Sequence, residues 1–180
     1  MAKNNTPVDK NSREYLLRKA ANGRHSLLLI VIFTVVNMVM TLLDTGTYFL
    51  FSASVPYHLV LMGMAFDNGF ADGAWHVRST LTYTGLALAL VIVAVYLLCW
   101  LLSKKREGFL TAALVPFIID TAALVILAFV LYENPVSQLM DLLLHIWVIV
   151  ELVQAAGACK KLKLLPPAQE PQSIRTGPDL

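Results

Sequence analysis

Charged residues are scarce in this chain. Asp, Glu, Lys and Arg make up 14% of its 180 residues, and 57% of the residues are apolar. A soluble domain is about 25% charged and about 45–50% apolar, so this composition excludes a disordered chain and argues against a water-soluble fold. The formal net charge is only +2, which is too small to indicate nucleic-acid binding as a main activity.

Cysteine is also rare, and the familiar catalytic motifs are missing. The only two cysteines, Cys99 and Cys159, exclude a disulfide scaffold. The sequence contains no GxSxG, HExxH, CxxC, P-loop or dinucleotide-binding motif. It therefore predicts no cofactor, and it argues against an enzyme without excluding one.

Four apolar segments are long enough to cross a membrane. They cover residues 26–48, 80–102, 109–132 and 138–158. A helix needs about 20 residues to span about 30 Å of hydrocarbon, and a spanning segment must satisfy its backbone groups internally, as a helix does. The sequence thus predicts an all-α, multi-pass protein with a bundle of four transmembrane helices.

The basic residues indicate how the bundle is oriented, because residues 47–66 are apolar enough to form a fifth span. With four spans, thirteen of the fourteen Lys and Arg residues face the cytoplasm, and Arg78 is the exception. With five, the basic residues from Lys104 onward would face outside. Because cytoplasmic loops carry the Lys and Arg excess, we expect four spans with both termini in the cytoplasm. A plasma membrane, and in particular the bacterial inner membrane, fits this topology.

Residues 47–66 must then stay on the outer side. Pro56 and Gly63 interrupt a long helix there, so we expect an extension of the first helix followed by a short helix that re-enters the membrane or lies at its surface. A re-entrant backbone needs protein or water around it. Residues at about 55–79 would then cap the outer end of the bundle.

Both ends of the chain are polar. Residues 1–25 are predicted to form a basic cytoplasmic segment with a short amphipathic helix, which Asn11 caps and Asn22-Gly23 ends. Residues 159–180 are predicted to form a cytoplasmic tail. From residue 166 onward its Pro- and Gln-rich composition predicts disorder.

Several ionisable residues lie inside the predicted spans, where they are costly and mark functional sites. Asp120 follows Pro116 by one turn and lies roughly 17 Å from Phe109, near the centre of the bilayer. Asp141 and His145 are one turn apart in the last span. The first span carries a stripe of polar residues on one helix face, namely Thr34, Asn37, Thr41 and Asp44.

These acids have no basic partners, because no Lys or Arg lies inside a span. They can stay protonated, pair with His145 or the outer Arg78, or hold a cation. A water-filled vestibule open to the outside would favour all three. A hard or borderline metal ion held by Asp44, Asp141 and His145 is a further alternative. The sequence therefore predicts an outward-facing polar cavity lined by Asp120, Asp141, His145, Asn37, Asp44 and Thr41.

Each polar group also has a structural interpretation. Asp141 and His145 would satisfy each other near the headgroups, and the polar stripe of the first span would provide hydrogen bonds between helices. For Glu151, which lies off the face of Asp141 and His145, a contact with another subunit stays open.

Three functions are compatible with these features. The leading hypothesis is binding or movement of a cation, proton or small molecule through the cavity, and it implies a homo-oligomer because four helices are few for a transporter. The alternative is a non-catalytic accessory or scaffold subunit, bound to a partner membrane protein in a larger complex. The third is a membrane-embedded enzyme that uses Asp141 and His145 as an acid–base pair on a lipid.

Overall fold

The computed structural model describes residues 12–68, 80–106, 108–131 and 138–166, and all regular structure in these ranges is helical. Four of the helices are long and apolar enough to cross a membrane, and a shorter helix lies between the first and second of them. This confirms the all-α prediction with four candidate spans. The helices are α1 (Arg13–Leu42), α2 (Ser54–Asn68), α3 (Thr80–Leu102), α4 (Gly108–Leu131) and α5 (Leu139–Leu164).

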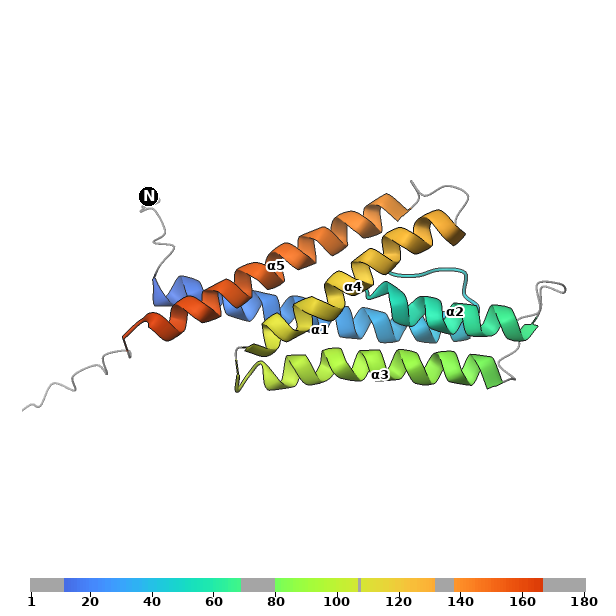
Figure 1. Cartoon of the computed structure of the whole chain (residues 1–180), viewed down its shortest axis with the longest axis horizontal. Coiled ribbons are helices and arrows are strands. Elements are labelled where there is room, and N and C mark those ends of the chain that lie inside the picture. Colours follow the sequence, from blue (N-terminus) through green and yellow to red (C-terminus); the bar gives the residue numbers. More distant parts are fainter. Residues whose placement is uncertain (1–11, 69–79, 107, 132–137, 167–180) are drawn as a thin grey trace, which may run out of the picture.

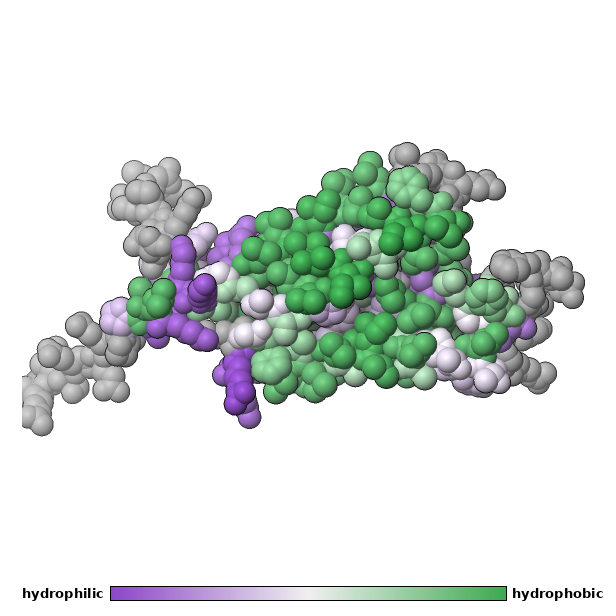
Figure 2. Space-filling view, in the orientation of Figure 1, coloured by the Kyte–Doolittle hydropathy of each residue, from purple (hydrophilic) through white to green (hydrophobic). Residues whose placement is uncertain are grey.

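The helices form one elongated bundle in which α2 packs mainly on α3 and α5 packs mainly on α1 (Figure 1). Large apolar side chains cover most of its outer surface. Figure 2 shows them over the long middle of the visible face, with hydrophilic side chains gathered where α1 begins and α5 ends. An apolar surface of this extent needs a hydrocarbon environment, so the helices are in contact with a lipid bilayer.

The first helix differs from the prediction at both of its ends. Its N-cap is Ser12, whose side chain accepts a hydrogen bond from the Tyr15 N–H, and not Asn11, which lies outside the described residues. The predicted stop at Asn22-Gly23 is wrong, because α1 is continuous through it. Gly23 is buried there, and a Cβ atom at this position would overlap the side chain of Ala155 in α5. The glycine allows two helices to approach closely, and this contact outweighs its low helix propensity.

The predicted extension of the first helix beyond residue 47 is also wrong. The helix ends at Leu42, and Asp44 and Gly46 have positive φ angles of 51° and 65°. This left-handed backbone cannot continue an α-helix, so the chain reverses direction. Residues 43–53 return into the bundle as far as Thr34, whose side-chain oxygen accepts a hydrogen bond of 2.8 Å from the Ala53 N–H. From there α2 runs back toward the end of the bundle at which α1 ends, as a re-entrant helix (Figure 1).

Close backbone contacts hold α2 against α3. A Cβ atom at Gly85 would overlap the carbonyl oxygen of Leu59, and one at Gly63 would lie 2.8 Å from the carbonyl oxygen of Leu81. The Asp67 carboxylate accepts a 2.6 Å hydrogen bond from the Thr82 N–H in the first turn of α3. It thereby satisfies one of the N–H groups that a helix start leaves without a partner. The re-entrant helix is therefore fixed at both of its ends.

The remaining spans match the sequence closely, except at the C-terminal end. The third and fourth helices lie within one residue of the predicted boundaries, whereas α5 continues six residues beyond residue 158 to Leu164. Four predicted features lie outside the described residues: the segment before residue 12, the outer loop at 69–79 with Arg78, the turn at 132–137, and the tail from 167.

Candidate functional site

The imidazole of His145 lies between two acids in the interior of the bundle. Its Nε2 atom is 3.2 Å from Oδ2 of Asp120, and its Nδ1 atom is 2.9 Å from the backbone oxygen of Asp141 and 3.5 Å from Oδ1 of that residue. The exposed fractions of Asp120, Asp141 and His145 are only 2%, 4% and 2%. The structure thus brings together three of the six predicted cavity residues, from α4 and α5, and we call them the acid–histidine cluster.

The hydrogen bonds constrain the proton positions in this cluster. A backbone carbonyl only accepts, so Nδ1 of His145 must carry a hydrogen. Nε2 faces a carboxylate, which accepts when it is ionised, so that nitrogen carries a hydrogen as well. The imidazole is then a cation paired with Asp120. Stacking of the Phe117 ring on His145, with ring centroids 5.0 Å apart, adds a favourable cation–π contact.

The second partner of Asp120 is the start of the re-entrant helix. Its two carboxylate oxygens accept hydrogen bonds of 2.8 Å from the backbone N–H groups of Ser54 and Val55. The first turn of a helix has free N–H groups and a partial positive charge, which favour a carboxylate. Asp141 gains the same stabilisation from its own helix, because it lies in the first turn of α5. Two helix starts and one imidazole therefore take the place of the missing Lys and Arg side chains.

One oxygen of the cluster is left without a hydrogen bond. Oδ1 of Asp141 is buried and has no hydrogen-bond partner among the residues that the structure describes. Its nearest positive charge is Nδ1 of His145 at 3.5 Å, an ion-pair contact without a hydrogen bond, so a proton or a cation that binds this oxygen would stabilise it further. This atom is the chemically open position of the cluster.

A second buried histidine, His58, lies in the first turns of α2, where its Nδ1 atom donates a 2.8 Å hydrogen bond to the Ser54 carbonyl. Burial lowers the pKa of His58 below its usual value, although the hydrogen bond to Ser54 and the charges of Asp120 and Asp141 oppose this shift. Burial thus disfavours a positive charge on this side chain.

Two residues of the polar stripe on α1 hold the re-entrant segment. The side-chain amide of Asn37 donates hydrogen bonds of 2.7 Å to the Phe49 carbonyl and to Oγ of Ser52. The side-chain oxygen of Asn37, Oδ1, accepts one of 2.7 Å from the Phe49 N–H. Together with the bond between Thr34 and Ala53, these contacts satisfy irregular backbone inside the bundle. Asn37 thus adjoins the start of α2, and in the described part of the chain its side chain bonds to Phe49 and Ser52 and not to the cluster itself.

The other two predicted cavity residues lie elsewhere. Thr41 donates a hydrogen bond to the Asn37 carbonyl within α1, and Asp44 is exposed after the end of that helix. Both line a separate cavity of about 120 Å³ between α1 and α2, with Tyr48 and Tyr57. In the described ranges, no three His, Cys, Asp or Glu residues are arranged to hold a metal ion.

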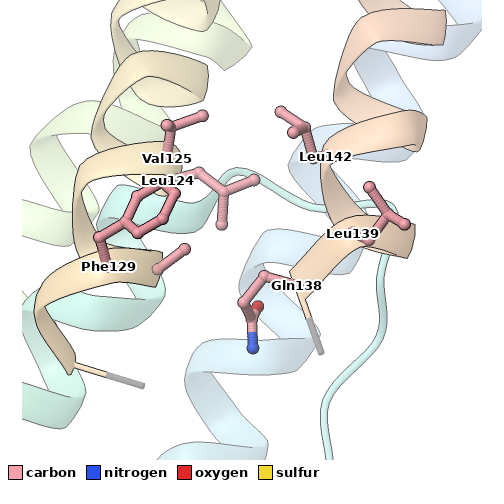
Figure 3. A pocket seen from close by; sticks show the side chains of 7 residues that line it. Leu124, Val125, Phe129, Gln138, Leu139 and Leu142 are labelled. Carbon is pink, nitrogen blue, oxygen red and sulfur yellow. The ribbon is translucent and has the colours of Figure 1, made fainter. Parts of the chain in front are cut away.

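A larger cavity of about 350 Å³ lies between α4 and α5, next to the cluster. Figure 3 shows apolar side chains of the two helices facing each other across it, with the Gln138 amide between them. The cavity begins one turn from the cluster, since Leu124 follows Asp120 by four residues and Gln138 precedes Asp141 by three. Whereas the sequence predicted a polar vestibule, this cavity is mainly apolar. Its lining residues are Leu124, Val125, Ala128, Phe129, Gln138, Leu139 and Leu142.

Sequence reasoning missed Ser54, which starts the re-entrant helix. A serine two residues before Pro56 is a helix-start signal that would have placed it. Its Oγ atom lies 3.4 Å from Nε2 of His145, a spacing that suggests a nucleophile and its base. However, Nε2 directs its hydrogen to the Asp120 carboxylate, so it has no lone pair with which to accept the serine proton. The geometry therefore disfavours Ser54 as a nucleophile activated by His145.

Glu151, at the middle of α5, is separate from the cluster. Its Oε1 atom lies 3.9 Å from Nζ of Lys19, which also donates a 2.6 Å hydrogen bond to Gln154. These contacts join α1 to α5 within the chain.

No model of a known protein family, no curated protein and no solved structure matches this chain. The interpretation of the cluster therefore depends on its geometry and chemistry.

Proposed function

We propose that the protein binds a proton or another small cation at Asp141 and passes it into the acid–histidine cluster. The observation that supports this function is the buried Oδ1 atom of Asp141, which has no hydrogen-bond partner among the described residues and lies 3.5 Å from His145. With Asp120 ionised and His145 protonated, an ionised Asp141 gives the cluster a net charge of −1. Uptake of one cation at Asp141 neutralises it, which a low-dielectric interior favours.

The order of the three residues supports a pathway for a proton. Asp141 is the third residue of α5, about 5 Å from the start of that helix. His145 contacts both acids, one through each ring nitrogen. Because both nitrogens carry a hydrogen, His145 first releases the Nε2 proton to Asp120, and the neutral ring then turns so that the free Nε2 takes up a proton from Asp141. A proton that enters from the outer end would in this way reach the centre of the bundle.

The cavity between α4 and α5 extends the proposal to small molecules. A cation with an apolar body would place that body against Leu124 and Leu142 and direct its charge toward Asp141. Gln138, at the edge of the cavity, offers a polar contact. Since four helices are few for a transporter, we include a homo-oligomer in the proposal.

The experiment compares two acid-to-amide variants of α5 in reconstituted vesicles. Asp141→Asn removes the proposed uptake site, whereas Glu151→Gln removes an acid of the same helix outside the cluster. Proton flux, followed with a trapped pH-sensitive dye under an imposed gradient, should fall at least about tenfold in Asp141→Asn. It should stay within about twofold of the unmodified protein in Glu151→Gln. An unchanged flux in Asp141→Asn would refute the proposal.

An accessory subunit is the second candidate, and one observation favours it. Apart from Thr111, the exposed face of α4 is apolar, and its Ile119 and Ile126 side chains are exposed. A partner helix could pack on this face in place of lipid. This function predicts that Asp141→Asn leaves flux unchanged and that the protein co-purifies with a defined membrane protein. Charged substitution of Ile126 would then abolish the co-purification.

A further inference from the structure

A second pocket lies at the opposite end of the bundle from the acid–histidine cluster. It has a volume of about 540 Å³ and lies between the α3–α4 connection, the first turns of α4 and the last turn of α5. Three of its six lining residues carry a positive charge, and none of the six is acidic. We call it the basic pocket, and its lining residues are Lys105, Arg106, Gly108, Phe109, Ala112 and Lys163.

We infer that the basic pocket binds the phosphate of an anionic phospholipid from the adjacent leaflet. This site is independent of the proposed function, since it lies at the other end of the molecule. Lys105 and Arg106 come from one segment and Lys163 from another, so their charges converge on one volume only in the folded bundle. Arginine binds phosphate through two parallel N–H groups, and lysine adds a point charge. Basic pockets between transmembrane helices bind lipid headgroups in this way.

The apolar residues around the pocket favour a lipid over a free phosphate ion. Ala112 lines the pocket, and Val115 and Ile119 follow it by three and seven residues, on the same face of α4. The exposed fractions of Val115 and Ile119 are 57% and 63%. An acyl chain attached to a phosphate in the basic pocket would lie along this apolar face. A free phosphate ion would make no use of such a face, so the face favours a lipid.

The alternative explanation is that these basic residues only orient the protein in the membrane. Other cations at the same end of the bundle provide a matched control, because they do not line the pocket. Arg18 pairs with Glu14, Lys104 lies over the Trp100 ring, and Lys160 is exposed on α5. Glu107, which follows Arg106 in the chain, lies outside the described residues.

The experiment measures lipid binding by native mass spectrometry of the full chain in detergent. Dioleoyl phosphatidylglycerol is the probe, and dioleoyl phosphatidylcholine is the neutral comparison. The pocket variant carries Lys105→Gln, Arg106→Gln and Lys163→Gln, and the control variant carries Arg18→Gln, Lys104→Gln and Lys160→Gln. We expect the affinity for phosphatidylglycerol to fall at least about tenfold in the pocket variant and less than about twofold in the control. Circular dichroism confirms that each variant keeps its helical content.

A third variant, Lys105→Arg with Lys163→Arg, keeps the charge and should keep the binding, even if the pocket variant does not fold. Equal losses in the pocket and control variants would overturn the inference in favour of a general charge effect. Displacement of the lipid by millimolar inorganic phosphate, or equally tight binding of glycerol phosphate without acyl chains, would overturn it in favour of a free-anion site.

Discussion

Asp120 links three elements of the structure through a single carboxylate. It accepts hydrogen bonds from two backbone N–H groups at the start of α2 and one from His145 in α5, while it belongs to α4. In Asp120→Asn the shape is kept, but the NH₂ group of the amide faces a backbone donor and the charge is lost. We expect a loss of about 1–3 kcal/mol in the free energy of unfolding, measured by thermal or denaturant unfolding in detergent.

Thr121 provides the control for this prediction, because among the described residues its hydroxyl bonds only to the Phe117 carbonyl within α4. Thr121→Val should change the unfolding free energy by less than about 0.5 kcal/mol. Equal stability of Asp120→Asn and the unmodified protein would contradict the role of Asp120 in holding α2.

The sequence could predict that Asp120, Asp141 and His145 lie close together. Their depths in the bilayer, and the helix face that Asp141 and His145 share, follow from the helical repeat. The partners of Asn37 were not. They belong to the backbone of residues 49–52, whose position depends on the left-handed turn at Asp44 and Gly46. Left-handed conformation at an aspartate costs little, so hydropathy and spacing give no sign of it.

Among the elements, the contact of α2 with α3 depends on a glycine. Gly85 lies directly against the Leu59 carbonyl, whereas Gly157 in α5 has open space where a Cβ atom would be. We therefore expect the same substitution to have opposite effects at the two positions. Gly157→Ala should stabilise the protein by about 0.5–1 kcal/mol through helix propensity, and Gly85→Ala should destabilise it by at least about 1 kcal/mol.

Thermal unfolding of both glycine variants in the same detergent measures this difference. A Gly85→Ala protein as stable as the unmodified one would mean that α2 and α3 do not approach as closely as the structure has them. Crosslinking between cysteines introduced on α2 and α3 would then report the changed distance.

The spans were predictable as elements because their length and apolarity follow from the thickness of hydrocarbon alone. The break expected at Gly23 did not occur, because the packing of that glycine on Ala155 is a tertiary contact that local propensity does not include. For α2, Pro56 and Gly63 indicated a short separate helix, whereas the depth of this helix in the bundle is set by hydrogen bonds that the backbone N–H groups at its start donate to Thr34 and Asp120. Those partners belong to two other helices.

At the scale of the whole molecule, charge is distributed along the bundle axis. Every Lys and Arg among the described residues belongs to the first half of α1, the segment that follows α3 or the end of α5, and these segments meet at one end of the bundle (Figure 1). The acid–histidine cluster and the re-entrant helix lie toward the other end. The basic pocket and the proposed cation site therefore face opposite leaflets.

This asymmetry predicts the orientation of the protein, because basic ends of membrane proteins stay in the cytoplasm. Thr45 lies after α1 at the outer end, and Lys104 lies after α3 at the basic end, and both are exposed. Each is changed separately to cysteine in a Cys99→Ala, Cys159→Ala background. In intact bacterial cells, a membrane-impermeant maleimide should label Thr45→Cys at least about tenfold faster than Lys104→Cys. Permeabilised cells should label both equally, which controls for thiol reactivity. The reverse preference in intact cells would invert the topology, and the cluster would then take up its cation from the cytoplasm.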